Sequence, residues 1–424
     1  KHDWNLGPTG ARGWMWGMRL RTDLARQILI TKVDRGSPAD GILNKGDVIL
    51  GVGGKNFDSD ARIAMGKAIT EAEKEENKGI LKLTRWRQGK TETVDLKIGV
   101  MGSYSDLAPM NCTKSKKILE NACRYIAKKK IGRGIPGNVN ALGLLASGDP
   151  QYLPMIRDYA RSLKVADVKK KMSSWNMCYM NLFLSEYYLL TKDEEVLPKI
   201  REMALYLAHG QSRVGTWGHS NAGADGIILG YGAMCQPSLS CAVSLILNQK
   251  CGIDDPVVEK AIRKSEIFFT TFVNRGNIPY GDGTPREVHD SNGRSSLAAI
   301  LYDLLDNPEA YAFYARMTVA SYSQREEGHT GNYWGMLWGP LGAMRAGPKA
   351  AADFLAEQRW FYELERRWDG GFTYQGGAAM SGSEHTTPGW DTTGARALVY
   401  AMSLQKLHIT GKGLKQEKFL KGKE

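Results

Sequence analysis

From about residue 114 onward, the pattern of apolar and polar positions alternates between two kinds of segment. One kind is apolar and rich in small residues, which is typical of helices buried on most sides; these segments cover residues 139–146, 175–191, 237–248, 295–305, 334–346 and 394–407. The other kind is charged and amphipathic with a helical period; these segments cover residues 116–130, 152–163, 196–210, 257–274, 310–326 and 350–367. Buried inner helices that alternate with half-exposed outer helices predict a closed ring of helical hairpins.

The first hundred residues follow a different pattern, in which short β-rich runs alternate with turns. Strands are predicted at residues 27–33, 47–52, 79–85 and 92–98, with one amphipathic helix at 61–74. Residues 101–113 are rich in turn formers and lack periodicity, so we expect a linker there. The chain is therefore predicted to be multi-domain: residues 1–100, the linker, an all-α part over 114–410, and a basic tail over 411–424.

A turn-rich stretch in the first part reads Arg35-Gly-Ser-Pro-Ala-Asp-Gly-Ile-Leu-Asn-Lys-Gly-Asp-Val-Ile-Leu, followed by Val52-Gly-Gly-Lys-Asn. It resembles the core signature of a PDZ domain, a β-sandwich or barrel with helices, in the circularly shifted form common in bacteria. The resemblance implies a groove between a strand at 14–20 and the helix at 61–74, which would bind the C-terminus of a peptide by strand addition. The implied peptide-binding residues are Gly13, Trp14, Met15, Trp16 and Gly17. A groove filled by the chain's own segments is the alternative.

Two motifs in the second part read Trp368-Asp-Gly-Gly-Phe372 and Trp390-Asp-Thr-Thr-Gly-Ala-Arg-Ala-Leu398. They resemble repeats of protein prenyltransferases and of squalene or terpene cyclases, which implies an (α/α)6 toroid. The Asp-x-Asp-Asp motif of the cyclases and the zinc-ligand spacing of the prenyltransferases are both missing from the sequence. The resemblance therefore speaks for the fold more than for the reaction. A PDZ domain ahead of such a toroid resembles a bacterial family with this organisation.

Glycine-aromatic loops connect each outer segment to the next inner one, so they gather on one face of the predicted ring, which we call the loop face. Four of the seven histidines lie in these loops. The candidate catalytic residues on this face are His219, Asp225, Tyr280, Asp282, His289, Asp290, His329, Tyr333, His385 and Asp391. The candidate substrate-binding residues are Trp217, Asn221, Asn292, Trp334, Tyr374, Glu384 and Trp390. For any single histidine, a structural role is the alternative.

Histidine, tyrosine and carboxylate groups in an aromatic cleft suit general acid and base chemistry on a carbohydrate. We therefore expect a polysaccharide hydrolase or lyase. No cofactor motif is evident, although three histidines and a carboxylate could instead hold a divalent metal that activates water. The alternatives are a non-catalytic scaffold, with a peptide in the PDZ groove and a second ligand at the ring mouth, and isoprenoid chemistry of the cyclase or prenyltransferase kind.

Composition narrows the choice of partners and compartment. The formal charge of +12 suggests solvated surface or attraction to an acidic partner such as an anionic polysaccharide. Nucleic acid is disfavoured because the basic runs lack interleaved aromatic residues, and no apolar run is long enough to span a membrane. The six cysteines are expected as buried thiols, with Cys241–Cys251 or Cys112–Cys123 bridges as alternatives in an exported protein. We expect an extracytoplasmic location, periplasmic or secreted.

Overall fold

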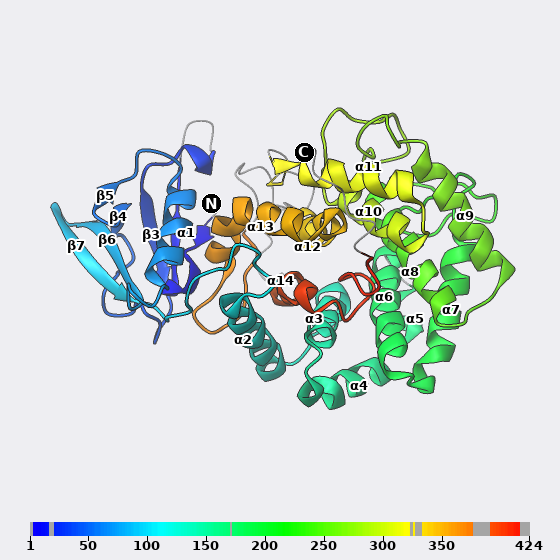
Figure 1. Cartoon of the computed structure of the whole chain (residues 1–424), viewed down its shortest axis with the longest axis horizontal. Helices are drawn as coiled ribbons and strands as arrows, with labels where there is room; N and C mark the ends of the chain where they lie inside the picture. The colour runs from blue at the N-terminus through cyan, green and yellow to red at the C-terminus, as the bar shows by residue number, and fades with distance from the viewer. Residues whose placement is uncertain are drawn as a thin grey trace.

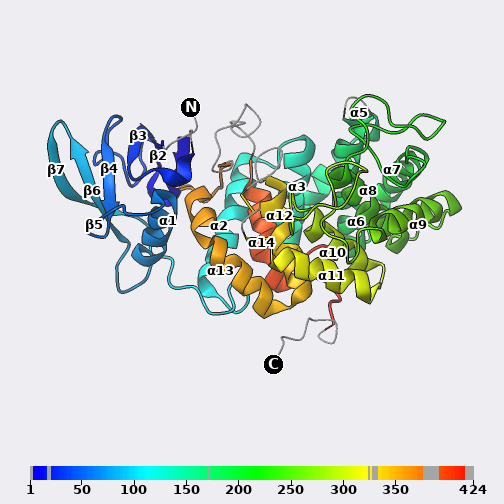
Figure 2. The same cartoon turned by 90° about the horizontal axis from the view of Figure 1, so that it is seen from above.

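The strands lie at one end of the molecule and most of the helices at the other, with α13 (Pro348–Glu365) and α1 (Ala61–Ala72) between them (Figures 1 and 2). The computed structural model describes residues 3–16, 21–169, 172–322, 325–326, 333–375 and 391–415. We call residues 3–100 the β-domain and residues 113–411 the helical region. In the part of the chain that is described, no helix is both long and apolar enough to cross a membrane.

The β-domain is built on one antiparallel sheet with the strand order β1-β2-β3-β4-β6-β7, and β5 pairs with β4. The strands are β1 (Asp3–Asn5), β2 (Ala11–Trp14), β3 (Ile28–Val33), β4 (Val48–Val52), β5 (Lys55–Asn56), β6 (Ile80–Arg87) and β7 (Lys90–Lys97). Apolar residues that alternate along β3 and β4 bury one face of the sheet. Helix α1 begins after Asp60, whose side chain accepts a hydrogen bond from the backbone N–H of Arg62.

Among the described residues, the predicted strand at residues 14–20 overlaps the observed strand only at Trp14. Strand β2 ends at Trp14, and residues 17–20 lie outside the described residues. Strand β1 was not predicted, because its three residues show no alternation. A short 3-10 turn, η1 (Gly7–Thr9), connects β1 to β2, and a second, η3 (Thr22–Leu24), precedes β3.

The helical region contains the two kinds of helix that the sequence predicts. The nearly fully buried helices are α3 (Gly134–Ser147), α6 (Ser173–Thr191), α8 (Cys235–Lys250), α10 (Arg294–Leu304), α12 (Tyr333–Ala343) and α14 (Thr393–Ala401). The helices buried on one side are α2 (Thr113–Lys129), α4 (Leu153–Ser162), α7 (Leu197–His209), α9 (Pro256–Thr270), α11 (Pro308–Val319) and α13. Short helical turns are α5 (Val165–Val168), η4 (Pro150–Tyr152), η5 (Glu194–Val196), η7 (Met344–Ala346) and η9 (Met402–Leu404).

The buried helices pack in sequence order, each against the next, and α14 packs against α3. At this last contact the backbones come close, because a Cβ on Gly394 would lie 2.4 Å from the Cα of Asn140. The side-chain oxygen of Asn140 accepts a hydrogen bond of 2.8 Å from the Gly394 N–H. Polar caps start the helices that follow the short turns at the opposite end from the loop face; these caps are Asp149, Asp193, Asp255 and Asn307.

The two parts of the molecule are joined by buried charges, which we call the ionic junction: Glu73 at the end of α1, Lys114 in α2, and Glu363 and Arg366 at the end of α13. Glu73 forms ion pairs with Lys114 at 2.8 Å and with Arg366 at 2.6 Å. The Nε of Arg366 donates to Glu363 at 2.8 Å. Each of these four side chains is at most 8% exposed. Such a network fixes the two parts against each other, whereas two domains joined only by a flexible linker can move relative to one another.

The segment predicted as a linker is bonded to both parts. The backbone N–H groups of Met101 and Gly102 donate to the carbonyl oxygen of Glu73 at 3.0 and 2.9 Å. The Tyr104 hydroxyl donates to Glu363 at 2.6 Å. The six cysteines are buried free thiols.

Candidate functional site

Seven aromatic side chains form a continuous set of ring contacts at the loop face, and we call them the aromatic row. In order of contact they are Tyr280, Tyr231, His219, Trp175, Trp334, Tyr333 and Tyr374. Neighbouring ring centroids lie between 4.7 and 6.5 Å apart. Trp175 and Trp334 come from the first turns of α6 and α12, whereas the tyrosines at the two ends come from loops. Helix starts and loops from distant parts of the chain thus meet in one place.

Among the residues that the structure describes, the aromatic row is open to solvent at the end that holds Tyr231. Tyr231 is 63% exposed, whereas Trp334 and Tyr333 are buried. Tyr231 contacts His219 at 5.4 Å and Tyr280 at 6.0 Å between ring centroids. Tyr280 also lines a shallow hollow of about 610 Å³ formed by residues 279–281 and 283–288. A ligand can therefore approach the row from the side of Tyr231, His219 and Tyr280.

The tautomer of His219 follows from its partner. The indole Nε1 of Trp175 lies 3.1 Å from Nδ1 of His219. An indole N–H can only donate, so Nδ1 accepts, and the neutral imidazole carries its proton on Nε2. In this state Nε2 of His219 carries a proton, and it can act as a base there only after the proton has moved.

Two candidate catalytic aspartates accept hydrogen bonds from the first turns of helices. Asp290 accepts hydrogen bonds from the backbone N–H of Ser295 and from the Ser296 hydroxyl, in the first turn of α10. Asp391 accepts from the backbone N–H of Thr393 at 2.9 Å and from the Asn140 side chain at 2.9 Å. Both carboxylates satisfy orphan N–H groups at helix N-termini, which is a structural use of the same side chains.

The remaining candidate residues do not belong to the aromatic row. Asp225, Asp282 and His289 are exposed, and Asp225 accepts from the N–H of Ile227 within its own turn. Three candidate substrate-binding residues have structural partners or positions: Trp217 is buried and donates to Leu207, Asn221 donates to Tyr206, and Asn292 is buried with a φ of 55°. Gly17, His329, Glu384, His385 and Trp390 lie outside the described residues. Within the ranges that the structure describes, no three His, Cys, Asp or Glu side chains form a group that could hold a metal ion.

The residues of the predicted peptide groove lie in and just after β2. Gly13 and Trp14 pair with β3 on one side and with β1 on the other. Met15 is buried, and Trp16 is 53% exposed. Of the residues that the prediction assigns to the peptide groove, Gly13 and Trp14 are thus paired with the chain's own residues 3 and 4.

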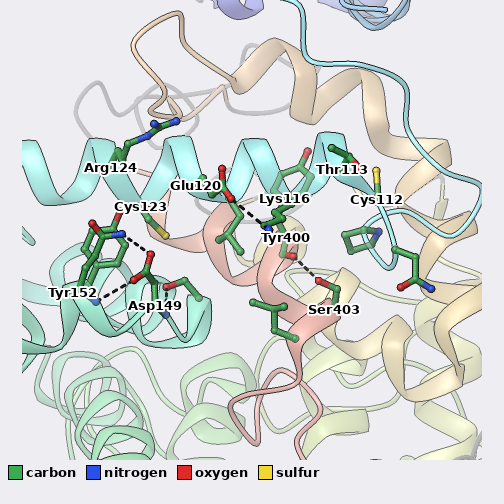
Figure 3. A pocket seen from close by; sticks show the side chains of 16 residues that line it. Cys112, Thr113, Lys116, Glu120, Cys123, Arg124, Asp149, Tyr152, Tyr400 and Ser403 are labelled. Carbon is green, nitrogen blue, oxygen red and sulfur yellow. Dashed lines mark hydrogen bonds and ion pairs between the residues drawn. The ribbon is translucent and has the colours of Figure 1, made fainter.

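Sequence reasoning missed a groove of about 770 Å³ along α2 (Figure 3). One wall carries Cys112, Lys116, Glu120 and Arg124 along the helix, and the opposite wall includes Asp149, Tyr152 and Ser403. Individually these residues resemble ordinary solvated helix and turn positions. No local signal in the sequence shows that α2, the turn at η4 and the end of α14 enclose a common space.

Cys112 is the N-cap of α2 and lines this groove. Its Sγ accepts hydrogen bonds from the backbone N–H groups of Ser105 and Ser115, each at 3.4 Å. Burial raises the pKa of the Cys112 thiol, but hydrogen bonds from Ser115 and Ser105 outweigh it, so the pKa lies below the ordinary value. Cys123 lines the same groove, and burial raises its pKa to about 12.

Two family models match the chain. The model of the PDZ domain matches residues 10–84, and the model described as Domain of unknown function (DUF6288) matches residues 115–411. No match was found among curated proteins or among solved structures. The first match identifies the β-domain as a PDZ domain, a class with roles in protein interaction, and the second covers the helical region.

Proposed function

We propose that this chain, which belongs to the DUF6288 family and carries a PDZ domain ahead of the family's helical domain, binds a polysaccharide chain at the loop face. In this proposal the helical region is a six-hairpin toroid. The order in which the buried helices pack, with α14 against α3, supports that arrangement. The main support for binding is that Tyr231, at the open end of the aromatic row, contacts Tyr280, which lines the adjacent hollow.

A sugar ring needs two things from a protein: a flat apolar surface for its C–H face, and polar groups at the edge for its hydroxyls. Tyr231 supplies an exposed ring, and the polar imidazole of His219 lies next to it, with the ring centroids 5.4 Å apart. Tyr280 adds a third ring beside the hollow. This combination of rings with a polar imidazole suits a saccharide better than it suits a purely apolar isoprenoid.

Charge favours an acidic polysaccharide over a neutral one. Helices α8, α10, α12 and α14 all begin directly after the loops of the loop face, so their positive dipole ends point toward it. The formal charge of +12 adds a long-range attraction for anions. We also propose that the protein cleaves the bound polysaccharide by a hydrolase or lyase mechanism. It would be exported to the compartment where such polysaccharides occur.

The test is a titration of the full chain with an alginate oligosaccharide, which is acidic, and with a dextran oligosaccharide, which is neutral. We expect binding of the acidic ligand, weakened about tenfold by Tyr231→Ala, since an aromatic anchor contributes roughly 1.4 kcal/mol. Tyr322→Ala is the matched control, because Tyr322 is an exposed tyrosine outside the aromatic row. Equal affinity of the wild type and Tyr231→Ala would contradict the proposal.

A turnover assay on the same samples separates binding from catalysis. A lyase creates unsaturated sugar ends that absorb in the ultraviolet, and a hydrolase creates reducing ends without them. Binding without either product would leave the protein as a polysaccharide-binding scaffold.

A further inference from the structure

An extended strand of the chain itself, β1, already lies along strand β2 of the PDZ domain. Strand β1 pairs antiparallel with β2 in the register Asp3 to Trp14, Trp4 to Gly13 and Asn5 to Arg12. The other edge of β2 pairs with β3, so both edges are used. The segment also contacts α1, because a Cβ on Gly7 would lie 2.6 Å from the Ile69 side chain. Residues 3–5 therefore lie along β2, and Trp4 and Gly7 contact residues of α1, where strand addition would place a PDZ ligand.

The outer edge of β1 is satisfied by the helical region. The Gln375 side-chain amide both accepts from the Asn5 N–H and donates to the Asn5 carbonyl, each at 2.9 Å. It thus replaces the neighbouring strand that a sheet edge lacks. The Asn5 side chain donates to the carbonyls of Leu364 and Arg366 at 2.6 and 2.8 Å.

Trp4 occupies a socket that both domains build. Its ring meets Phe361 of α13 edge-on at 6.0 Å, and none of it is exposed. The Arg62 guanidinium, from α1, lies 4.9 Å from the Trp4 ring and 5.0 Å from the Trp360 ring. Arg62 is held by ion pairs to Asp60 at 2.6 Å and to Glu326 at 2.5 Å. Because the Arg62 cation lies against the rings of both Trp4 and Trp360, the socket recognises an aromatic side chain at position 4.

We propose that residues 3–5 are the ligand of this PDZ domain, bound within the same molecule in a socket composed of the PDZ domain and the helical region. The ligand class is an extended internal segment with a tryptophan followed by an asparagine, and a free C-terminal carboxylate is not required. The chain continues from Asn5 through the η1 turn into β2, so no terminus lies in the groove. A peptide in trans must displace β1 before it can bind.

The proposal is tested on the full chain with a labelled synthetic peptide of residues 1–9. The variants are Trp4→Ala, which empties the socket, and Trp86→Ala as the matched control, because Trp86 is a half-exposed tryptophan on β6 of the same domain. Fluorescence anisotropy measures binding, and a thermal melt measures stability. We expect Trp4→Ala to melt several degrees below the wild type, to bind the peptide, and to regain melting temperature when it is added. The wild type and Trp86→Ala should bind at least tenfold more weakly.

Two results would overturn this assignment. One is peptide binding that is as tight to the wild type as to Trp4→Ala. The other is tight binding of C-terminal peptides to the wild type that is lost when the peptide is amidated. If Trp4→Ala fails to fold, hydrogen exchange of the wild type decides. The amides of β1 and β2 should exchange as slowly as those of the β3–β4 ladder, and rapid exchange of residues 3–5 would refute a bound strand.

Discussion

Glu73 and Arg366 are 293 positions apart in the chain, yet their side chains form an ion pair of 2.6 Å in which Glu73 is 1% exposed. Glu73 ends the helix of the PDZ domain, and Arg366 follows the last outer helix of the helical region. Charges that are removed from water require good partners, because desolvation is costly. The ionic junction provides these partners only when both domains are docked, so the docked arrangement is the one in which these charges can be buried.

Removing one member of the ionic junction should therefore destabilise the whole molecule. In Glu363→Gln, Arg366 keeps Glu73 but loses its second carboxylate, and Lys114 loses a partner at 3.5 Å. We expect the free energy of unfolding to fall by about 3–5 kcal/mol, as for other broken buried pairs. Asp353→Asn is the control on the same helix, since its pair with Lys349 is exposed and should change stability by at most about 0.5 kcal/mol. Chemical denaturation measures both, and equal effects would contradict the prediction.

The same carboxylate predicts a pH dependence. Burial raises the pKa of Glu363, but the charges of Arg366 and Lys114 outweigh burial and lower it to about 2. A pKa below the unfolded value, about 4.3, means that ionised Glu363 stabilises the fold. This contribution is complete above about pH 4.5 and is lost as the pH falls toward 2. Between pH 7 and 2, the free energy of unfolding should fall less steeply with decreasing pH for Glu363→Gln than for the wild type. Equal slopes would exclude Glu363 as a source of the acid sensitivity.

Gly66 in the middle of α1 distinguishes docked from independent domains. On a free helix, Gly66→Ala should stabilise by about 1 kcal/mol, because alanine is the better helix former. Here a Cβ on Gly66 would lie 2.5 Å from the Trp360 carbonyl oxygen and 2.8 Å from the Trp360 Cα. We therefore expect destabilisation of about 1–3 kcal/mol from overpacking. Gly99→Ala is the control, with open space around it. A higher melting temperature for Gly66→Ala would mean that α1 and α13 do not pack in solution.

Cys112 should be the first of the six thiols to react with a small alkylating reagent. Its lowered pKa gives more thiolate at neutral pH than Cys123 has in the same groove, where the pKa is about 12. Mass spectrometry after brief treatment of the native protein with iodoacetamide identifies the modified residue. Cys112→Ser should remove most of the rapid labelling, whereas Cys123→Ser should leave it. Equal labelling of all six cysteines would point to unfolding during the reaction.

Periodicity predicted the regular elements closely because each depends on its own residues. Helix α6 was expected at 175–191 and spans Ser173–Thr191, and β3 was expected at 27–33 and spans Ile28–Val33. Strand β1 was missed because its three residues show no alternation; pairing with β2 and the bonds from Gln375 to Asn5 hold it extended. Its three residues carry no local signal.

The candidate site was predicted in part for a similar reason. Of the candidate residues from the glycine-aromatic loops, His219, Tyr280 and Tyr333 belong to the aromatic row, and their role as a site stays a prediction. Asp290 and Asp391 stand at helix starts, where a capping role was available from sequence spacing alone. Tyr231 was overlooked because nothing next to it in the sequence shows that it folds back onto His219.

The short connection between β1 and β2 has a consequence for self-association. Gly7 and Gly10 both have positive φ, at 65° and 76°, so the tight turn depends on two residues without side chains. A bulkier residue at either position would favour an extended hinge. Strand β1 could then reach the β2 edge and the socket of a second molecule, and two chains would exchange N-terminal strands with the contacts of β1 preserved. The two glycines thus keep β1 folded back onto its own molecule, although the same strand could join two molecules.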